Sequence, residues 1–253
     1  MAQRRVTDEP AFVLHRYDWS EASLVLEVFS RHHGRMALVA KGVKRPTSQF
    51  RPVLLPLQPL LLAWGGDAEV RTLKSAQWQG GHVMPIGDAL LAGSYLNELL
   101  LRLLARDDPH PRLFDHYRRA VQLLASGQGT VPWVLRAFEL VLLRETGLLP
   151  DLAHEGSTLL PVQADCHYAL DAENGLRLAR ADEANTLSGE QALLLQSALD
   201  ASEPDAGLWA ACATCEAALR QPLRTLLHYH SGVQVFKTRQ LMLDVQALNR
   251  APT

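Results

Sequence analysis

Apolar and polar residues alternate with a period of two in the first third of the chain. The alternation is clear in residues 24–30 and resumes in residues 36–40, after a turn signal at Gly34. A period of two is typical of β-strands that bury one face. Shorter extended runs lie at residues 12–15, 57–64 and 70–73. About five short strands in this span predict a small β-barrel.

From Asp88 the apolar period changes to 3.6, which indicates amphipathic helices. The first predicted helix has Asp88 as its N-cap and the Asp107–Pro109 stretch as its stop. Two more helices are expected, one ending near Gly127 and one running from about Pro132 to Gly147. Together they predict a helical bundle behind the barrel.

Residues 148–187 lose the helical period and are predicted to form an irregular or hairpin insertion. Helical signals resume with Ser188 and Gln191, which have the spacing of a capping box. An Ala-rich helix over about 208–230 is expected to restart or bend at Pro222, and a last helix starts near Lys237. The predicted fold is α+β, with a barrel domain over 1–82, a helical domain over 83–253, and the insertion inside the latter.

Composition narrows the class of protein. The chain has 253 residues, of which 47% are hydrophobic and 21% charged, as expected for a folded domain with a sizeable core. Its most apolar stretch, VLLPLQPLLLAW, is short and contains two prolines, so neither a signal peptide nor a membrane span is predicted. Three cysteines are too few for a disulfide framework. We expect a cytoplasmic protein that does not enter a membrane.

The net charge of −2 hides an asymmetry. Residues 1–82 contain 11 Lys and Arg against 7 Asp and Glu, whereas the remainder contains 14 against 20. A basic N-terminal part beside an acidic C-terminal part is expected if only the former meets a polyanion.

The basic charge concentrates around the loop AKGVKRPTSQFR, in a window without Asp or Glu from Glu27 to Asp67. We predict that this loop contacts nucleic-acid phosphates, and six contacts to a single strand would give a logarithmic salt slope of about −4. A solvated loop that only keeps the sheet soluble is the alternative. Among nearby aromatic residues, Phe50, Trp64 and Trp78 have the chemistry to stack on bases, although burial is expected for both tryptophans. The six candidate cations are Arg31, Arg35, Lys41, Lys44, Arg45 and Arg51.

Four segments, in this order and spacing, resemble the bacterial RecO family of recombination mediators along almost the whole chain. They are GRMALVAKGVKRPTSQFRPVLLPLQPLLL, YLNELLLRLL, RAFELVLLRETGLLP and RTLLHYHSGVQVFKTRQLML. The resemblance implies an N-terminal OB-fold, a C-terminal helical domain and an insertion. It also implies binding of single- and double-stranded DNA, annealing of complementary strands, and cooperation with RecR in loading RecA onto DNA coated by single-strand binding protein (SSB). The implied location is the bacterial nucleoid.

The resemblance extends to candidate partner sites. RecO-like proteins bind the acidic, apolar C-terminal tail of SSB, for which Arg136 is the candidate cation and Tyr95, Leu96 and Leu99 are candidate walls. Simple helix packing is the alternative for these apolar residues. The FKTRQ stretch resembles the family's Lys-Ser-Arg element, with Thr238 in place of serine. Lys237 and Arg239 in that stretch are candidates for contacting DNA or RecR, and a helix N-terminal pair that faces water is the alternative. The remaining DNA candidates are Arg71 and Lys74, on the last predicted strand.

Two groups of residues resemble metal or catalytic sites, but their surroundings in the sequence argue against such sites. Cys212 and Cys215 form a CxxC, but they lie in an Ala-rich helix rather than in metal-binding loops. Some relatives carry two CxxC pairs in the insertion, where this chain has only Cys166, with His154 and His167 nearby. No GxxxxGK[ST], HExxH or GxSxG motif occurs. We therefore predict no metal, no cofactor and no enzyme activity. The rival hypotheses are an OB-fold protein that binds RNA and a metal-dependent nucleic-acid hydrolase.

Overall fold

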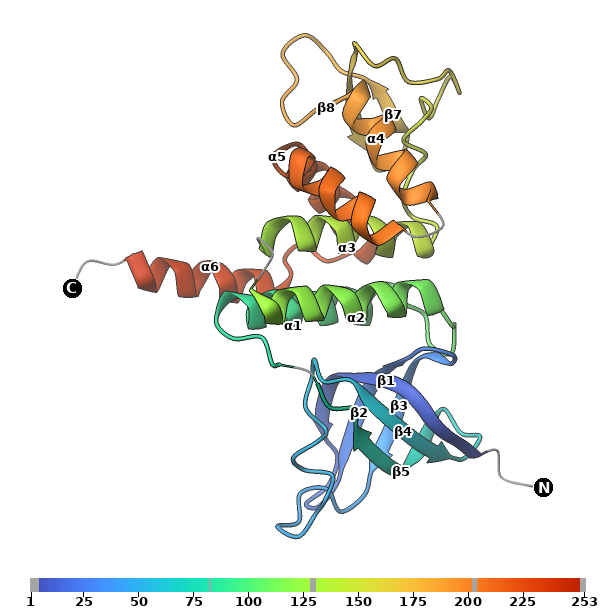
Figure 1. Ribbon diagram of the computed structural model, residues 1–253, viewed down its shortest axis with the longest axis vertical. Coiled ribbons are helices and arrows are strands. Elements are labelled where there is room, and N and C mark those ends of the chain that lie inside the picture. Colours follow the sequence, from blue (N-terminus) through green and yellow to red (C-terminus); the bar gives the residue numbers. More distant parts are fainter. Residues whose placement is uncertain (1–4, 82, 128–130, 202–203, 251–253) are drawn as a thin grey trace. The chain divides into compact units, whose positions relative to one another are not determined.

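The computed structural model describes residues 5–81, 83–127, 131–201 and 204–250. Five strands close into a barrel in the order β1-β2-β3-β5-β4 (Figure 1). β3 and β5 pair in parallel, and the other neighbours pair antiparallel. The predicted small barrel is confirmed. The strands are β1 (Arg5–Asp18), β2 (Leu24–Ser30), β3 (Gly34–Ala40), β4 (Leu60–Gly65) and β5 (Val70–Trp78).

Alternate residues of the strands fill the barrel, as a period of two requires. Val28, Leu38 and Leu62 are among the fully buried side chains of this core, and Trp64 is buried with them as expected. The expectation of burial is wrong for Trp78, which is 46% exposed. It is the last residue of β5 and lies beyond those that face the core.

In the described part of the chain six helices follow, with boundaries close to the predicted ones but not identical. Asp88 is the first helical residue rather than the N-cap, which is Gly87 and makes no side-chain cap. The first helix ends before Leu104, where the backbone becomes extended, and so stops short of the predicted Asp107. The capping box of Ser188 and Gln191 is confirmed. The helices are α1 (Asp88–Leu103), α2 (Pro111–Ser126), α3 (Val131–Glu145), α4 (Gly189–Asp200), α5 (Pro204–Ser231) and α6 (Lys237–Arg250).

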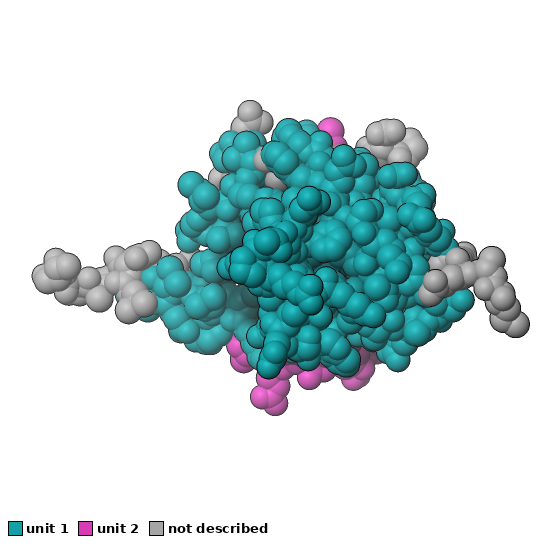
Figure 2. All heavy atoms as spheres, turned by 90° about the horizontal axis from the view of Figure 1, so that it is seen from below, with its two compact units in different colours: residues 1–127, 237–253 teal, residues 128–236 magenta. Residues whose placement is uncertain are grey.

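The chain forms two compact units (Figure 2). Unit 1 comprises residues 1–127 and 237–253, so α1, α2 and α6 belong with the barrel. Unit 2 comprises residues 128–236 and contains α3, α4 and α5. The boundary predicted after residue 82 stays a prediction, and residue 82 itself lies outside the described residues.

The insertion in unit 2 contains a small three-stranded sheet in the order β7-β6-β8. Its β6 (His167–Asp171) and β7 (Gly175–Leu178) form the hairpin that the sequence indicated, and β8 (Leu187–Ser188) leads into α4. The α5 helix runs through Pro222 as one element.

A bulge in β1 lies at a buried contact between the barrel and the helices of unit 1. The pairing of β1 with β2 shifts register between Val13 and His15, so Leu14 is the extra residue. The buried amide of Asn97 in α1 donates to the Leu14 carbonyl over 3.1 Å, and the Tyr117 hydroxyl of α2 donates to Asn97 Oδ1 over 2.6 Å. A bulge redirects the side chains that follow it. The half of β1 after Leu14 is exposed and presents its residues to the two surfaces described below.

Candidate nucleic-acid interface

The basic loop is held in place against the turn between β1 and β2. The backbone N–H of Lys44 donates to the Ala22 carbonyl over 3.1 Å, and its ammonium donates to the Ser20 carbonyl over 2.9 Å. The same ammonium lies 2.6 Å from the exposed Asp18 carboxylate. Gly42 has a φ of 71°, a left-handed conformation that glycine adopts at little cost. The loop is thus a fixed part of the barrel surface.

Three predicted cations of this loop face solvent. Lys41, Arg45 and Arg51 are exposed and form no salt bridge within the described part of the chain. Arg51 lines a hollow of about 180 Å³ with Lys44 and with Arg16 from β1. Arg16 is a cation that the sequence analysis missed, because it lies outside the acid-free window and beside Asp18.

An exposed tryptophan adjoins these cations. Trp19 is 69% exposed and lies in the turn to which Lys44 is bonded. The sequence held a signal for it, since the run DWSEAS is mostly polar. An exposed aromatic ring beside cations is the combination used to bind single strands. We call these residues the loop surface: Arg16, Trp19, Lys41, Lys44, Arg45 and Arg51.

Other predicted cations are matched by carboxylates of the same unit. Arg31 forms a two-pronged pair with Asp115 of α2, with distances of 3.0 Å and 2.7 Å. Hydrogen bonding to Asp115 raises the pKa of Arg31 despite partial burial. Arg71 lies 2.6 Å from Asp107. These contacts tie β5 and the β2–β3 turn to the α1–α2 segment.

Glu27 joins two arginines at the same junction. Its nearly buried carboxylate lies 3.5 Å from Arg35 Nε and bonds to Arg106, which also lies 2.7 Å from Glu69. Arg35 donates in addition to the Leu101 carbonyl of α1. We call this network the clamp: Arg31, Arg35, Arg71 and Arg106 with Glu27, Glu69, Asp107 and Asp115. A DNA role for Arg31, Arg35 and Arg71 stays a prediction, and their positive charge is already matched within the chain.

The last predicted cations lie on β5 and α6. Lys74 is exposed on β5 and forms no salt bridge among the described residues. Lys237 is exposed at the first position of α6, and Arg239 is half-buried. The Glu98 carboxylate of α1 accepts the backbone N–H groups of Lys237 and Thr238, each over 2.9 Å, and the Thr238 hydroxyl over 2.6 Å. Thr238 therefore joins the start of α6 to α1 through both its backbone and its hydroxyl.

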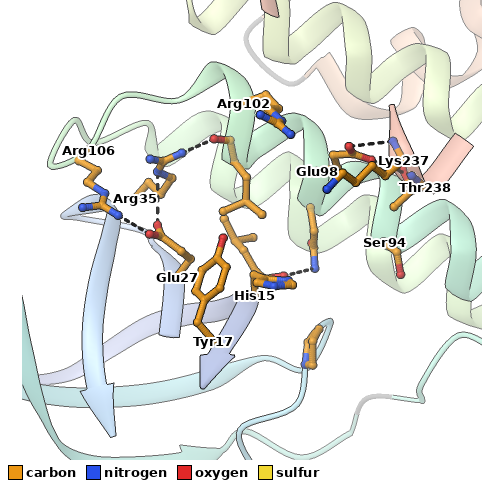
Figure 3. Close-up of a pocket in the computed structure, with 14 residues that line it drawn as sticks. His15, Tyr17, Glu27, Arg35, Ser94, Glu98, Arg102, Arg106, Lys237 and Thr238 are labelled. Carbon is orange, nitrogen blue, oxygen red and sulfur yellow. Dashed lines mark hydrogen bonds and ion pairs between the residues drawn. The ribbon is translucent and has the colours of Figure 1, made fainter. Parts of the chain in front are cut away.

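A cleft of about 620 Å³ lies between the bulged half of β1 and the helices α1 and α6 (Figure 3). His15 and Tyr17 stand on the barrel wall, while Glu98 and Arg102 stand on α1. The rings of His15 and Tyr17 meet edge to face, with centroids 4.4 Å apart. The cleft thus combines aromatic rings with cationic side chains inside unit 1.

The residues predicted to bind the SSB tail are divided between the two units. Tyr95, Leu96 and Leu99 are buried in α1 of unit 1. Arg136 is buried in α3 of unit 2, where it lies 2.9 Å from the fully buried Glu139. Packing and ion pairing account for all four positions, and their role in SSB binding stays a prediction.

The cysteines of the CxxC lie inside unit 2. Cys212 and Cys215 are buried on α5, and burial raises the pKa of both thiols. His154 pairs with Asp151 at 2.9 Å. Within the described ranges, no group of three His, Cys, Asp or Glu is arranged to hold a metal ion. No helix in the part of the chain that is described has the length and apolarity to cross a membrane.

Two family models and several known proteins match this chain along most of its length. Residues 1–81 match the family described as "Recombination protein O N terminal", and residues 86–240 match "Recombination protein O C terminal". Proteins named "DNA repair protein RecO" are similar along nearly their whole length. The one from Polaromonas naphthalenivorans is 61% identical over 249 residues, covering 98% of this chain and 100% of that protein. The one from Variovorax paradoxus is 60% identical over 256 residues, covering 98% and 99% respectively.

Proposed function

This chain belongs to the RecO family of non-enzymatic DNA repair proteins, and from that premise we propose that it acts as a recombination mediator. It binds single- and double-stranded DNA, anneals complementary strands, and with RecR helps to load RecA onto DNA coated by SSB. Its site of action is the bacterial nucleoid. The exposed cations of the loop surface support a role in unit 1 that requires no bond chemistry.

The observation that carries the proposal is the set of solvent-facing cations on the loop surface. Two DNA strands repel each other, and a cationic surface that neutralises phosphates on both lowers this barrier to pairing. Arg16, Arg45 and Arg51 have no carboxylate partner among the described residues, nor does Lys41. Four such contacts to a single strand give a logarithmic salt slope of about −3, and the loosely paired Lys44 would add to it.

The proposal is tested by salt-titrated DNA binding of the triple variant Lys41→Ala, Arg45→Ala, Arg51→Ala. Loss of three phosphate contacts reduces the magnitude of the slope by about 2 and weakens binding to every sequence alike. Thermal stability stays near that of the wild type, because exposed unpaired side chains contribute little to it.

A matched control carries Arg119→Ala, Arg180→Ala and Arg220→Ala, three exposed arginines outside the loop surface. It removes the same charge, and we expect wild-type binding. Equal weakening of both variants would show a dependence on net charge alone and would contradict a localised DNA surface.

Two rival functions have different outcomes. An RNA-binding OB-fold protein would prefer RNA in a competition titration, whereas the mediator binds DNA at least as tightly. A metal-dependent hydrolase would shorten labelled DNA in the presence of Mg²⁺ or Mn²⁺, whereas the mediator leaves strands intact and annealed.

A further inference from the structure

The end of β1 separates two different surfaces of unit 1. Arg16 lines the hollow of the loop surface with Lys44 and Arg51. Its neighbours His15 and Tyr17 line the cleft beside α1 and α6. Successive side chains of a strand point to opposite faces, and the bulge at Leu14 sets which residues face which way.

The acidic groups of the cleft are engaged inside the protein. Glu27 is held by Arg35 and Arg106 of the clamp. The Glu98 carboxylate accepts three hydrogen bonds from the start of α6. The lining sets these two carboxylates against four cationic side chains, which are Arg35, Arg102, Arg106 and Lys237.

Two cations of the cleft are available to a ligand. Arg102 and Lys237 are exposed, line the cleft from α1 and α6, and form no salt bridge within the described ranges. Because the lining has four cations and two carboxylates, the formal charge of the cleft is positive. It therefore favours an anionic ligand.

The aromatic wall narrows the class of anion. Tyr17 is 47% exposed, so part of its ring remains open to a ligand although His15 packs against it. Stacking on an aromatic ring is how proteins bind bases without reading their sequence, and a base is open to such stacking where its strand is unpaired. A nucleotide fits both features, because its phosphate can pair with the cations and its base can stack on the Tyr17 ring.

We propose that this cleft is a single-strand subsite, in which a base stacks on Tyr17 while adjacent phosphates meet Arg102 and Lys237. The inference rests on the proposed function and deepens it. The loop surface takes nucleic-acid backbones, paired or unpaired, whereas the cleft takes unpaired nucleotides. The two surfaces lie on either side of the end of β1. A protein with this arrangement holds an unpaired DNA strand next to the backbone of a second DNA strand.

The test compares three labelled ligands for the full chain: an oligothymidylate, a strand of the same length built from abasic sites, and a duplex. Tyr17→Ala weakens binding of the oligothymidylate by about fivefold or more, the effect of losing one stacked base. It leaves binding of the abasic strand and the duplex within about twofold of wild type. Tyr17→Phe keeps the ring and binds like wild type.

Arg102→Ala tests the phosphate contact separately. It reduces the magnitude of the salt slope for single strands by about 0.7, whereas Tyr17→Ala leaves that slope unchanged. The matched aromatic control is Tyr229→Ala, since Tyr229 is also an exposed tyrosine but lies on α5 of unit 2. It binds all three ligands like wild type. Thermal melting of each variant identifies any general loss of fold.

The possible failures are distinguishable. If the wild type binds none of the ligands, the proposed function is wrong. If it binds them but Tyr17→Ala and Arg102→Ala both behave like Tyr229→Ala, only the cleft inference is overturned. Equal loss for the thymidylate and abasic strands would also overturn it, because no base would then be stacked on Tyr17. Unchanged DNA binding with weakened binding of an acidic peptide would reassign the cleft to protein docking.

Discussion

The Glu9 side chain of β1 is buried. It accepts the Ser30 hydroxyl over 2.6 Å and the His32 backbone N–H over 2.7 Å, and it lies 3.0 Å from His32 Nδ1. Burial alone would raise its pKa, but these hydrogen bonds outweigh burial and hold the pKa below the ordinary value of 4.5. The folded protein therefore favours the ionised form.

This shift predicts a contribution to acid stability. A carboxylate whose pKa is lower in the folded state stabilises the fold fully above its unfolded pKa, and the contribution is lost as the pH falls through the folded pKa. We expect the unfolding free energy of the wild type to decrease below about pH 4.5. Glu9→Gln should lower stability near neutral pH and flatten this acidic limb. Urea unfolding at several pH values measures both, and parallel pH curves for the two proteins would rule out the linkage.

Arg136 makes a second prediction at the residue scale. Removing only one partner of its buried pair with Glu139 costs about 3–5 kcal/mol, so Arg136→Ala would confuse unfolding with loss of SSB binding. The double variant Arg136→Met, Glu139→Leu removes the charge while filling the space, and such replacements are often close to neutral in stability.

If Arg136 binds the SSB tail, the double variant should bind the tail peptide at least tenfold more weakly, a loss of about 1.4 kcal/mol, and DNA like wild type. Fluorescence titrations with each ligand measure the two affinities. Unchanged affinity for the peptide would assign Arg136 to packing alone.

The clamp joins elements that are distant in sequence. Asp107 and Asp115 belong to the α1–α2 segment, yet their partners Arg71 and Arg31 lie on β5 and the β2–β3 turn. A partly exposed, two-pronged ion pair contributes up to about 1 kcal/mol to stability. Several such pairs act together in the clamp, and they hold the barrel against these helices within unit 1.

We predict that Arg31→Ala lowers the unfolding free energy by up to about 1 kcal/mol and leaves the salt slope of DNA binding unchanged. Lys41→Ala should leave the unfolding free energy unchanged and reduce the magnitude of the salt slope of DNA binding. A double-mutant cycle with Asp115→Ala isolates the pair energy. If Arg31→Ala instead flattens the salt slope at constant stability, then Arg31 contacts DNA as its place in the acid-free window suggested.

Local patterns account for the elements that could be predicted from the sequence. The alternation in residues 24–30 and the 3.6 period after Asp88 depend on neighbouring residues alone, so they indicated β2 and α1 correctly. The pairing of β3 with β5 and the return of α6 to Glu98 depend on contacts between distant residues. Single-sequence patterns carry little information about such contacts.

The candidate site was predictable only in part for the same reason. The exposed cations of the loop were visible as a charge run without acids. Arg16 was missed because it lies outside the acid-free window and beside Asp18, and Tyr17 was missed because the extended run predicted there ended at residue 15. The carboxylate partners of Arg31 and Arg71 lie in the acidic half of the chain, beyond the window that identified these arginines.

At the scale of the whole molecule, the uneven distribution of charge along the chain has two consequences. Part of the negative charge after residue 82 pairs with arginines of the barrel through Asp107 and Asp115. Among the described residues, several cations without such partners lie on the loop surface and in the cleft. A protein with a formal net charge of −2 can therefore present a local positive surface to a polyanion.

The most direct test of the central claim is strand annealing on complementary DNA coated with SSB, measured at increasing salt concentrations. The wild type should accelerate annealing at low salt and lose this effect steeply as salt rises, since phosphate contacts are screened and replaced by ions. The variant Lys41→Ala, Arg45→Ala, Arg51→Ala should anneal slowly at every salt concentration. Annealing by this variant at the wild-type rate, with the wild-type dependence on salt, would contradict the account.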